Sequence, residues 1–195
     1  MPRVRLLAFS GSTRSGSYNQ RLVDIAASLA RTAGAEVASI HLRDFNLPIY
    51  DGDLEAEGFP EGPARLRTLF IEHDGFLIAA PEFNGSVSGA LKNAIDWASR
   101  PRPGDAGPLP AFRGKVAGIM SASVSDSGGL RGLLALRQIL GTIQTLVATE
   151  QALVPSADRA FDGSELTDAM ANRILPMLVN RVVLLAGALK AGGGP

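Results

Sequence analysis

Residues 10–19 combine the side chains that a phosphate-binding loop needs. The segment follows an apolar run, Val4 to Phe9, and consists of Ser10, Gly11, Ser12, Thr13, Arg14, Ser15, Gly16, Ser17, Tyr18 and Asn19. Its hydroxyl and amide groups can donate hydrogen bonds, and Arg14 offers a charged planar fork that suits phosphate oxygens. A helix that begins directly after the loop would favour an anion at its N-terminus. The composition alone also fits an ordinary Ser/Gly turn with a helix cap, and both interpretations remain open at this point.

A second polar loop, Pro81-Glu82-Phe83-Asn84-Gly85, follows the apolar run from Gly75 to Ala80. A run of this length that ends at a proline is typical of a strand covered on both faces. Leu91 and Ile95 lie four residues apart after Ser88, which predicts an amphipathic helix with Ser88 as its N-cap. In an open α/β sheet, ligands bind at the carboxyl ends of the strands. Taken alone, Phe83 would be a half-buried loop aromatic and Glu82 a surface or interface acid.

A third loop spans residues 121–129 and is rich in small residues. We expect Ser121, Ser123, Gly128 and Gly129 to place hydrogen-bond donors at the same sheet edge, and Asp126 to point into solvent. Neither G-x-x-x-x-G-K-[ST] nor G-x-G-x-x-G occurs in the chain, which disfavours a P-loop NTPase and a Rossmann dehydrogenase. His41 and His73 are isolated, cysteine is absent, and we expect no metal site.

The second loop and the helix after it carry a family resemblance. Pro-Glu-Phe-Asn-Gly-Ser, followed by Gly-x-Leu-Lys-Asn-Ala-Ile-Asp-Trp, resembles the signature of the NAD(P)H-dependent FMN reductases, which include quinone and chromate reductases. That family usually has Tyr at position 83 and often Pro at position 88. Gly-Ser-x-Arg-x-Gly-Ser-x-Asn, which begins at Gly11, is similar to the family's FMN phosphate loop. The likeness extends over nearly the whole chain, including Leu47 to Glu55 and Ala160 to Leu166.

The resemblance implies a site and two cofactors, FMN and NAD(P)H. The first loop would bind the FMN phosphate, the second would border the flavin ring, and the third would face the ring's pyrimidine edge. We name no catalytic acid or base, because the flavin carries the chemistry. The cofactor-binding residues expected are Ser10, Gly11, Ser12, Thr13, Arg14, Ser17, Tyr18, Asn19, Pro81, Glu82, Phe83, Asn84, Gly85, Ser121, Ser123, Gly128 and Gly129. Relatives form dimers and tetramers, so we expect a homodimer or homotetramer. We interpret Tyr50, Trp97 and Arg100 first as packing residues.

Alternating strand and helix patterns predict an α/β fold. Strands are expected at 4–9, 37–42, 75–80, 115–121 and 147–154. Helices are expected at 20–33, 64–72, 130–140 and 164–189, and a further helix is expected to begin at residue 89. Residues 44–63 are expected to be irregular. Five strands favour a flavodoxin-like, doubly wound parallel sheet in the order 2-1-3-4-5, with helices on both faces in a three-layer α/β/α arrangement. We expect one domain over residues 1–190 and a disordered tail over 191–195.

Composition limits the remaining function classes. The 195 residues are 46% hydrophobic and 19% charged, which is typical of a globular domain. Lys plus Arg and Asp plus Glu number 19 each, so no net field favours nucleic acid or an anionic membrane as a partner. No signal peptide or membrane span is expected, which together with the lack of cysteine fits a cytoplasmic protein.

Three functions are therefore compared. The leading hypothesis is an FMN-dependent NAD(P)H oxidoreductase that passes hydride from NAD(P)H through FMN to a small acceptor such as a quinone, free flavin, azo dye or metal oxyanion. The alternative is a flavodoxin-type electron carrier that does not turn over nicotinamide. Such carriers are usually strongly acidic, and the balanced charge of this chain counts against that alternative. A regulatory domain that has lost the cofactor is the third.

Overall fold

Five parallel strands form the central sheet of the computed structural model, which describes residues 3–193. The strands are β1 (Arg5–Ser10), β2 (Glu36–His41), β3 (Gly75–Ala79), β6 (Val116–Ala122) and β7 (Leu146–Val154), in the spatial order β2-β1-β3-β6-β7. Counted along the sheet strands alone, this is the order 2-1-3-4-5. The predicted flavodoxin-like topology is therefore confirmed.

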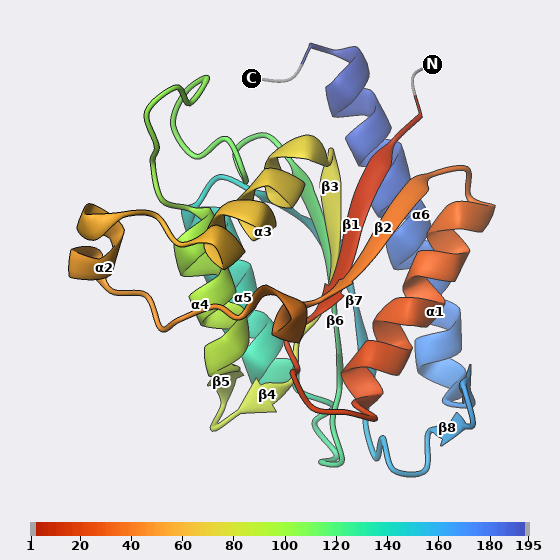
Figure 1. Ribbon diagram of the computed structural model, residues 1–195. Coiled ribbons are helices and arrows are strands. Elements are labelled where there is room, and N and C mark those ends of the chain that lie inside the picture. Colours follow the sequence, from red (N-terminus) through yellow and green to blue (C-terminus); the bar gives the residue numbers. More distant parts are fainter. Residues whose placement is uncertain (1–2, 194–195) are drawn as a thin grey trace.

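Helices cover both faces of the sheet (Figure 1). α1 (Tyr18–Thr32) and α6 (Ala169–Ala191) lie on one face, and α3 (Glu61–Glu72), α4 (Gly89–Ala98) and α5 (Leu130–Thr142) lie on the other. Successive side chains of β1 point alternately into the hydrophobic cores on the two faces of the sheet. Leu6 and Ala8 pack beneath α1 and α6, whereas Leu7 and Phe9 pack beneath α3 and α4. This alternation explains why the strand is apolar at every position from Leu6 to Phe9.

An aromatic cluster fills the core beneath α3. Phe70 is its centre, with ring centroids 5.3 Å from Phe9, 5.0 Å from Phe76 and 5.2 Å from Phe112. On the opposite face α6 approaches the sheet closely at Gly118, where a Cβ would lie 2.8 Å from the Val182 side chain. These dense contacts hold the sheet rigid beneath the loops at its edge.

Two segments differ from the expectation. Residues 44–63 are partly regular, because they contain the end of a 3₁₀ helix, η1 (Leu42–Phe45), a short helix α2 (Gly52–Glu57), and the first turn of α3. The last helix begins at Ala169 instead of residue 164. Residues 161–166 form instead a small hairpin of β8 (Phe161–Asp162) and β9 (Glu165–Leu166), which turns at Gly163 with φ of 57°, and Asp168 then caps α6.

α6 is also long and apolar enough to cross a membrane by length and composition, with 23 residues and a mean hydropathy of 1.6 over a window of 18. Leu175, Leu178 and Val182 are buried in the core, however, so one face of α6 packs against the sheet. It ends at Ala191, within the tail that was expected to be disordered, and Gly192 and Gly193 follow. Residues 194–195 of that tail lie outside the described residues.

Lys115 caps the C-terminal end of α3. Its Nζ donates hydrogen bonds to the carbonyl oxygens of Phe70, Ile71 and His73 at 2.5, 2.7 and 2.6 Å. These carbonyls lie at a helix end, where intrahelical partners are missing. Burial lowers the pKa of Lys115 to about 8, so the ammonium is still largely protonated at pH 7.

Replacing this cap should destabilise the fold. We expect Lys115→Met to lower the free energy of unfolding by about 2–3 kcal/mol, because three carbonyls lose a charged donor. Lys92→Met is the control, since the exposed pair of Lys92 with Asp96 is an i,i+4 contact worth only about 0.3–0.5 kcal/mol. Urea unfolding followed by circular dichroism measures both, and equal losses in the two variants would contradict this role of Lys115.

Candidate functional site

Three loops meet at the carboxyl edge of the sheet (Figure 1). Loop 1 (residues 11–17) follows β1, loop 2 (residues 80–88) follows β3, and loop 3 (residues 123–129) follows β6. These strands are neighbours in the sheet, so their carboxyl ends lie side by side. Loop 2 contains a hairpin of β4 (Glu82–Phe83) and β5 (Ser86–Val87) that the sequence did not predict.

Loop 1 is held in place by hydroxyl groups beneath it. Ser88 Oγ donates to the carbonyl oxygen of Gly11 at 2.6 Å, and Ser10 Oγ accepts from the N–H of Ser12 at 3.1 Å. Ser88 also caps α4 as predicted, by accepting from the N–H of Leu91 at 3.2 Å. A Cβ at Gly11 would lie 2.8 Å from Leu91 Cβ, so only glycine allows the loop to pass this close to α4.

The backbone of loop 1 presents a run of unused hydrogen-bond donors. Ser17 caps α1, and its Oγ accepts from the N–H of Gln20. Within residues 11–19, six backbone N–H groups have no hydrogen-bond acceptor among the described residues: those of Thr13, Ser15, Gly16, Ser17, Tyr18 and Asn19. Four of these groups belong to the loop, and two belong to the first turn of α1, where the helix dipole favours an anion. This arrangement fits a phosphate group.

Some side chains at loop 1 and the start of α1 make contacts within the protein. Asn19 is buried and is fully engaged with Ala122, donating from Nδ2 to its carbonyl at 2.7 Å and accepting its N–H at Oδ1 at 3.0 Å. The Tyr18 ring stacks on Phe161 at 5.9 Å. Arg14 is exposed, lies over the Tyr18 ring at 5.6 Å and donates from Nη2 to the carbonyl oxygen of Gly16 at 3.5 Å. Its other guanidinium N–H groups remain available to a ligand.

Loop 2 places one exposed aromatic beside the site. Asn84 and Gly85 form the hairpin turn with φ of 51° and 77°, which is the left-handed conformation that an Asn-Gly pair adopts readily. Phe83 is 57% exposed, in contrast to the half-buried position expected for a loop aromatic. An aromatic face that stays in solvent at this edge is available to a planar ligand.

Glu82 points inward and joins loop 2 to α5. Oε1 lies 2.9 Å from Nε and 2.7 Å from Nη2 of Arg131, and Oε2 accepts the N–H of Gly132 at 3.0 Å. Desolvation raises the pKa of Glu82, but the hydrogen bonds from Gly132 and Arg131 outweigh it and hold the pKa below its usual value. The carboxylate is therefore a clamp between two elements. It differs from the exposed surface acid that its sequence position alone suggested.

A buried hydroxyl at the end of β6, directly before loop 3, has no hydrogen-bond partner. Among the buried side-chain polar atoms of residues 3–193, Ser121 Oγ alone lacks a hydrogen bond. It lies against Gly129, where a Cβ would overlap it, and Gly128 and Gly129 both have positive φ, 60° and 88°. The hydroxyls of Ser123, Ser125 and Ser127 are linked at 3.0 Å, and Asp126 is exposed as expected.

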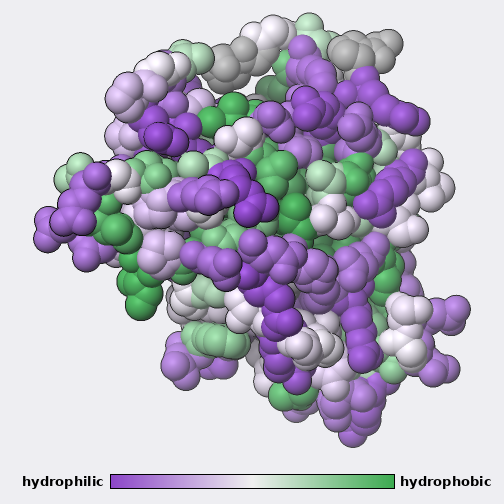
Figure 2. Space-filling model, in the orientation of Figure 1, coloured by the Kyte–Doolittle hydropathy of each residue, from purple (hydrophilic) through white to green (hydrophobic). Residues whose placement is uncertain are grey.

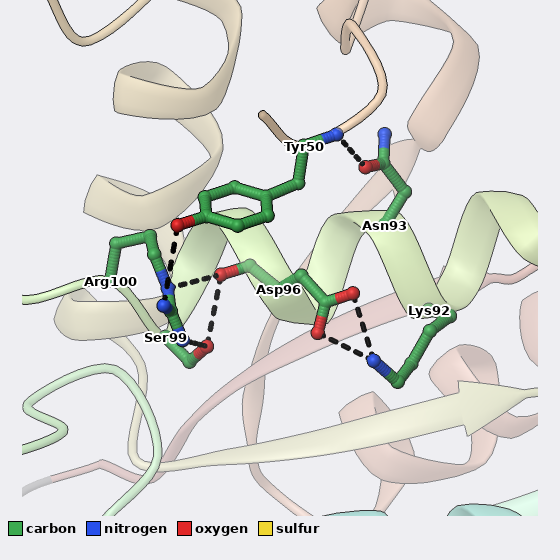
Figure 3. A network of polar contacts seen from close by, with 6 residues as sticks. All are labelled: Tyr50, Lys92, Asn93, Asp96, Ser99 and Arg100. Carbon is green, nitrogen blue, oxygen red and sulfur yellow. Dashed lines mark hydrogen bonds and ion pairs between the residues drawn. The ribbon is translucent and has the colours of Figure 1, made fainter. Parts of the chain in front are cut away.

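The segment from Pro48 to Glu55 is tied to α4, and Figure 3 shows this network. The N–H of Tyr50 donates to Asn93 Oδ1 at 2.8 Å, and Arg100 lies 5.0 Å from the Tyr50 ring. Trp97 is buried, and its Nε1 donates to the carbonyl of Pro48 at 2.8 Å. Packing was the first interpretation of Tyr50, Trp97 and Arg100, and these contacts agree with it.

The arrangement of the three loops defines a class of protein. A flavodoxin-like sheet with a donor-rich loop at the first strand and two further loops beside it can hold a nucleotide with its phosphate at α1. The free N–H groups and the unpaired Ser121 hydroxyl fit FMN, which carries both a phosphate and a polar ring edge. Arg131 and Gly132 were missed as partners of Glu82, because they lie in α5, beyond the third loop.

Comparison with known proteins identifies the family. The sequence profile described as NADPH-dependent FMN reductase matches residues 4–159. An NAD(P)H-dependent FMN reductase of Pseudomonas aeruginosa is 36% identical over 190 residues, which cover 96% of this chain and 97% of that protein. A quinone reductase of Escherichia coli is 35% identical over 74% of this chain and 73% of its own length.

A solved structure agrees with these matches. The flavoenzyme NAD(P)H:(acceptor) oxidoreductase FerB from Paracoccus denitrificans has a TM-score of 0.78 and 27% identity, covering 95% of this chain and 98% of that one. The chain belongs to the NADPH-dependent FMN reductase family. The resemblance seen in the sequence and the expected class, an oxidoreductase of FMN and NAD(P)H, are confirmed at the level of the family.

The clamp made by Glu82 leads to a prediction about acid stability. Because the pKa of Glu82 is depressed in the folded state, its contribution is present above the unfolded pKa of about 4.3 and is lost as the pH falls through the folded pKa. Glu82→Gln should lower the free energy of unfolding at pH 7 by about 1–2 kcal/mol and flatten its decline below pH 4. Denaturant titrations from pH 2 to 7 measure this, with exposed Glu36→Gln as control; parallel curves for wild type and Glu82→Gln would refute the clamp.

Proposed function

We propose that the protein is an FMN-dependent NAD(P)H oxidoreductase that passes electrons to a small acceptor such as a quinone, with free flavin, an azo dye or a metal oxyanion as other acceptors. The observation that carries this proposal is the run of six unused N–H groups at loop 1 and α1, beside two loops that can border a flat ring. Family membership supports the same conclusion.

Each loop has a separate part in holding FMN. The backbone of loop 1 and the Arg14 guanidinium would bind the 5′-phosphate. Phe83 would offer an apolar surface to the ring, with the backbone of the Asn84-Gly85 turn at its polar edge, and Ser121, Gly128 and Gly129 would face the pyrimidine end. When bound, FMN accepts a hydride from the nicotinamide and delivers electrons to the acceptor.

The chain's own residues position the cofactor and supply no proton in this proposal. Glu82 is engaged with Arg131 and Gly132 and is held ionised, so it is not available as a general acid. Asn19 is engaged with Ala122. Their function is to fix the loops so that the donors of loop 1 remain aimed at one phosphate position, which is pre-organisation of the binding site.

A homodimer or homotetramer is part of the proposal. Residues 46–60 form an arm that projects from the body of the molecule around α2 (Figure 1). α2 has no buried residue, Ile49 is 85% exposed, and Figure 2 shows hydrophobic side chains on this arm. An exposed large side chain on a projecting arm favours contact with a second copy of the chain. A cytoplasmic location is proposed with it, since the chain contains no cysteine.

The function is tested by anaerobic reduction. We expect the purified protein to show a flavin absorbance spectrum after saturation with FMN, and we expect that absorbance to bleach within seconds when NADPH is added. A quinone should then restore the oxidised spectrum. Bound flavin that stays oxidised with NADPH and NADH would favour the flavodoxin-type carrier. A protein that binds no flavin would reject both.

Arg14 provides a separate test of the phosphate site. Arg14→Ala should weaken FMN binding by about 1.5–3 kcal/mol, which is roughly 10- to 150-fold in Kd, because a charged hydrogen bond is lost. Quenching of flavin fluorescence measures the Kd, and riboflavin, which lacks the phosphate, should bind equally to wild type and variant. Exposed Arg173→Ala on α6 serves as control, and unchanged FMN affinity in Arg14→Ala would reject the assignment.

A further inference from the structure

The outer edge of β2 has no neighbouring strand. β2 is the first strand of the sheet, and within the described residues β1 alone pairs with it (Figure 1). The N–H of Glu36 donates to the carbonyl oxygen of Val4, which fixes the phase of that pairing. Because successive residues of a strand direct their backbone groups to opposite sides, the backbone groups of Val37, Ser39 and His41 point away from β1.

Most of these outward groups have no partner. In the described part of the chain, residues 3–193, no hydrogen bond is formed by the N–H groups of Val37, Ser39 and His41 or by the carbonyl oxygen of Ser39. The carbonyl of Val37 accepts a hydrogen bond from Arg31 Nη2 at 3.1 Å, and the same nitrogen donates to Ser39 Oγ at 3.1 Å. A row of free strand donors and acceptors is a template on which an extended chain can pair.

A hollow of about 500 Å³ lies along this edge, between β2 and α3. It is lined by Ser39, Ile40 and His41 of β2, Asp44 and Phe45 of η1, and Arg65, Thr68 and Leu69 of α3. Phe45 is buried, and Ile40 and Leu69 are half-buried, so part of the lining is an apolar surface. A pocket beside a free strand edge can accept one side chain of an added strand and so provides specificity.

Two arginines flank the edge, one on each face of the sheet. Arg31 lies in the last turn of α1, and Arg65 of α3 is exposed with its guanidinium 5.3 Å from the centre of the Phe45 ring. Neither forms an ion pair with a carboxylate within residues 3–193. Glu36 begins β2 and Asp44 follows the strand in η1, so these acids lie at the two ends of the edge. An acidic group on a ligand is therefore favoured between these ends, beside Arg31.

We propose that the edge of β2 binds an extended segment of a partner protein in which acidic and large apolar residues alternate. Side chains of an added strand point alternately to its two faces. One set meets Arg31 on the α1 side, and the other enters the hollow, where Arg65 is placed to lie over an aromatic ring. When an acidic side chain draws Arg31 away, the carbonyl of Val37 becomes free to accept a hydrogen bond from the segment. The inference depends on neither the flavin nor the electron donor.

A second copy of β2 is a poorer occupant of this edge. The strand contains one acidic residue, Glu36, and no Phe, Tyr or Trp. Pairing two such edges would also bring Arg31 and Arg65 of both copies together, and like charges placed against each other at an interface are unfavourable. The charges beside the edge therefore favour a partner with acidic side chains.

Amide hydrogen exchange measured by NMR tests the proposed pairing. In the free protein we expect the amides of Ser39 and His41 to exchange quickly and those of Ala38 and Ile40 slowly, because only the second pair bonds to β1. The probe is the peptide acetyl-Glu-Phe-Glu-Leu-Glu-amide. At saturation it should slow exchange at Ser39 and His41 by at least about tenfold.

Two results of this experiment would overturn the inference. One is unchanged exchange at Ser39 and His41 with about 1 mM peptide, which corresponds to binding too weak to be specific. The other is protection of these amides without peptide that rises with protein concentration, because a second copy of the chain would then cover the edge.

Methylated peptides distinguish strand pairing from contact through side chains alone. N-methylation of the three Glu residues removes one set of backbone donors, and N-methylation of Phe and Leu removes the other. Only one set faces β2, so one of the two peptides should bind at least about tenfold more weakly than the other. Equal affinities for the two peptides would refute strand pairing.

Two variants probe the protein side of the contact, with Arg173→Met on α6 as control. Ser39→Pro removes an outward N–H and keeps the pairing with β1, because proline is tolerated where the N–H of an edge strand faces solvent. It should lower the affinity about fivefold or more. Arg31→Met should abolish the preference for the Glu peptide over its Gln counterpart, which we expect to be about two- to fivefold in wild type. An unchanged preference in Arg31→Met, or unchanged binding by folded Ser39→Pro, would contradict this site. The methylated peptides decide the question if Ser39→Pro does not fold.

Discussion

Buried polar side chains that reach from one element to the backbone of another hold the edge of this sheet together. Asn19 of α1 forms two hydrogen bonds with Ala122 at the end of β6, Ser88 donates to Gly11 in loop 1, and Glu82 joins β4 to α5. A buried polar group must be paired, so each of these residues is costly to leave without its partner. Together they connect the ends of three neighbouring strands into one rigid surface. The exposed donors of loop 1 keep their positions because the side chains beneath them are fully engaged.

Because these side chains are bonded within the protein, backbone atoms would make most of the contacts with a ligand. The sequence drew attention to polar side chains in loop 1, yet Asn19, Ser10 and Ser17 use theirs to bond the protein's own backbone. The groups left over are mainly backbone N–H groups, together with the guanidinium of Arg14. Backbone donors lose little conformational freedom when they bind, because the loop is already fixed. Loop 1 is thus pre-organised by its serines and asparagine, and the glycine at position 11 lets it pass close to α4.

The sequence predicted the strand order and most elements, because buried strands and capped helices leave local signals. Ser88 was found as an N-cap from its position before an amphipathic pattern, and the structure confirms it. Two-residue strands leave no such signal, so both hairpins were missed, and the expected start of α6 fell within one of them. The partner of Glu82 lies 49 residues away, and the unpaired Ser121 hydroxyl depends on its contact with Gly129. Neither contact follows from local pattern, since both arise when distant segments pack.

The balanced net charge of the chain does not reveal how its charged residues are paired in the folded protein. Equal numbers of acidic and basic residues excluded a general attraction to polyanions, but the pairing of those residues is uneven. Arg67, Arg131 and Arg181 form ion pairs with carboxylates and stabilise the fold. Arg14, Arg21 and Arg43 line one hollow of about 160 Å³ beside loop 1 and have no carboxylate partner within residues 3–193. A Coulomb interaction falls with distance and is screened over about 8 Å at physiological ionic strength, so a local cluster acts on a ligand whatever the total charge is. The charges that matter for binding are therefore those that the fold brings together and leaves uncompensated.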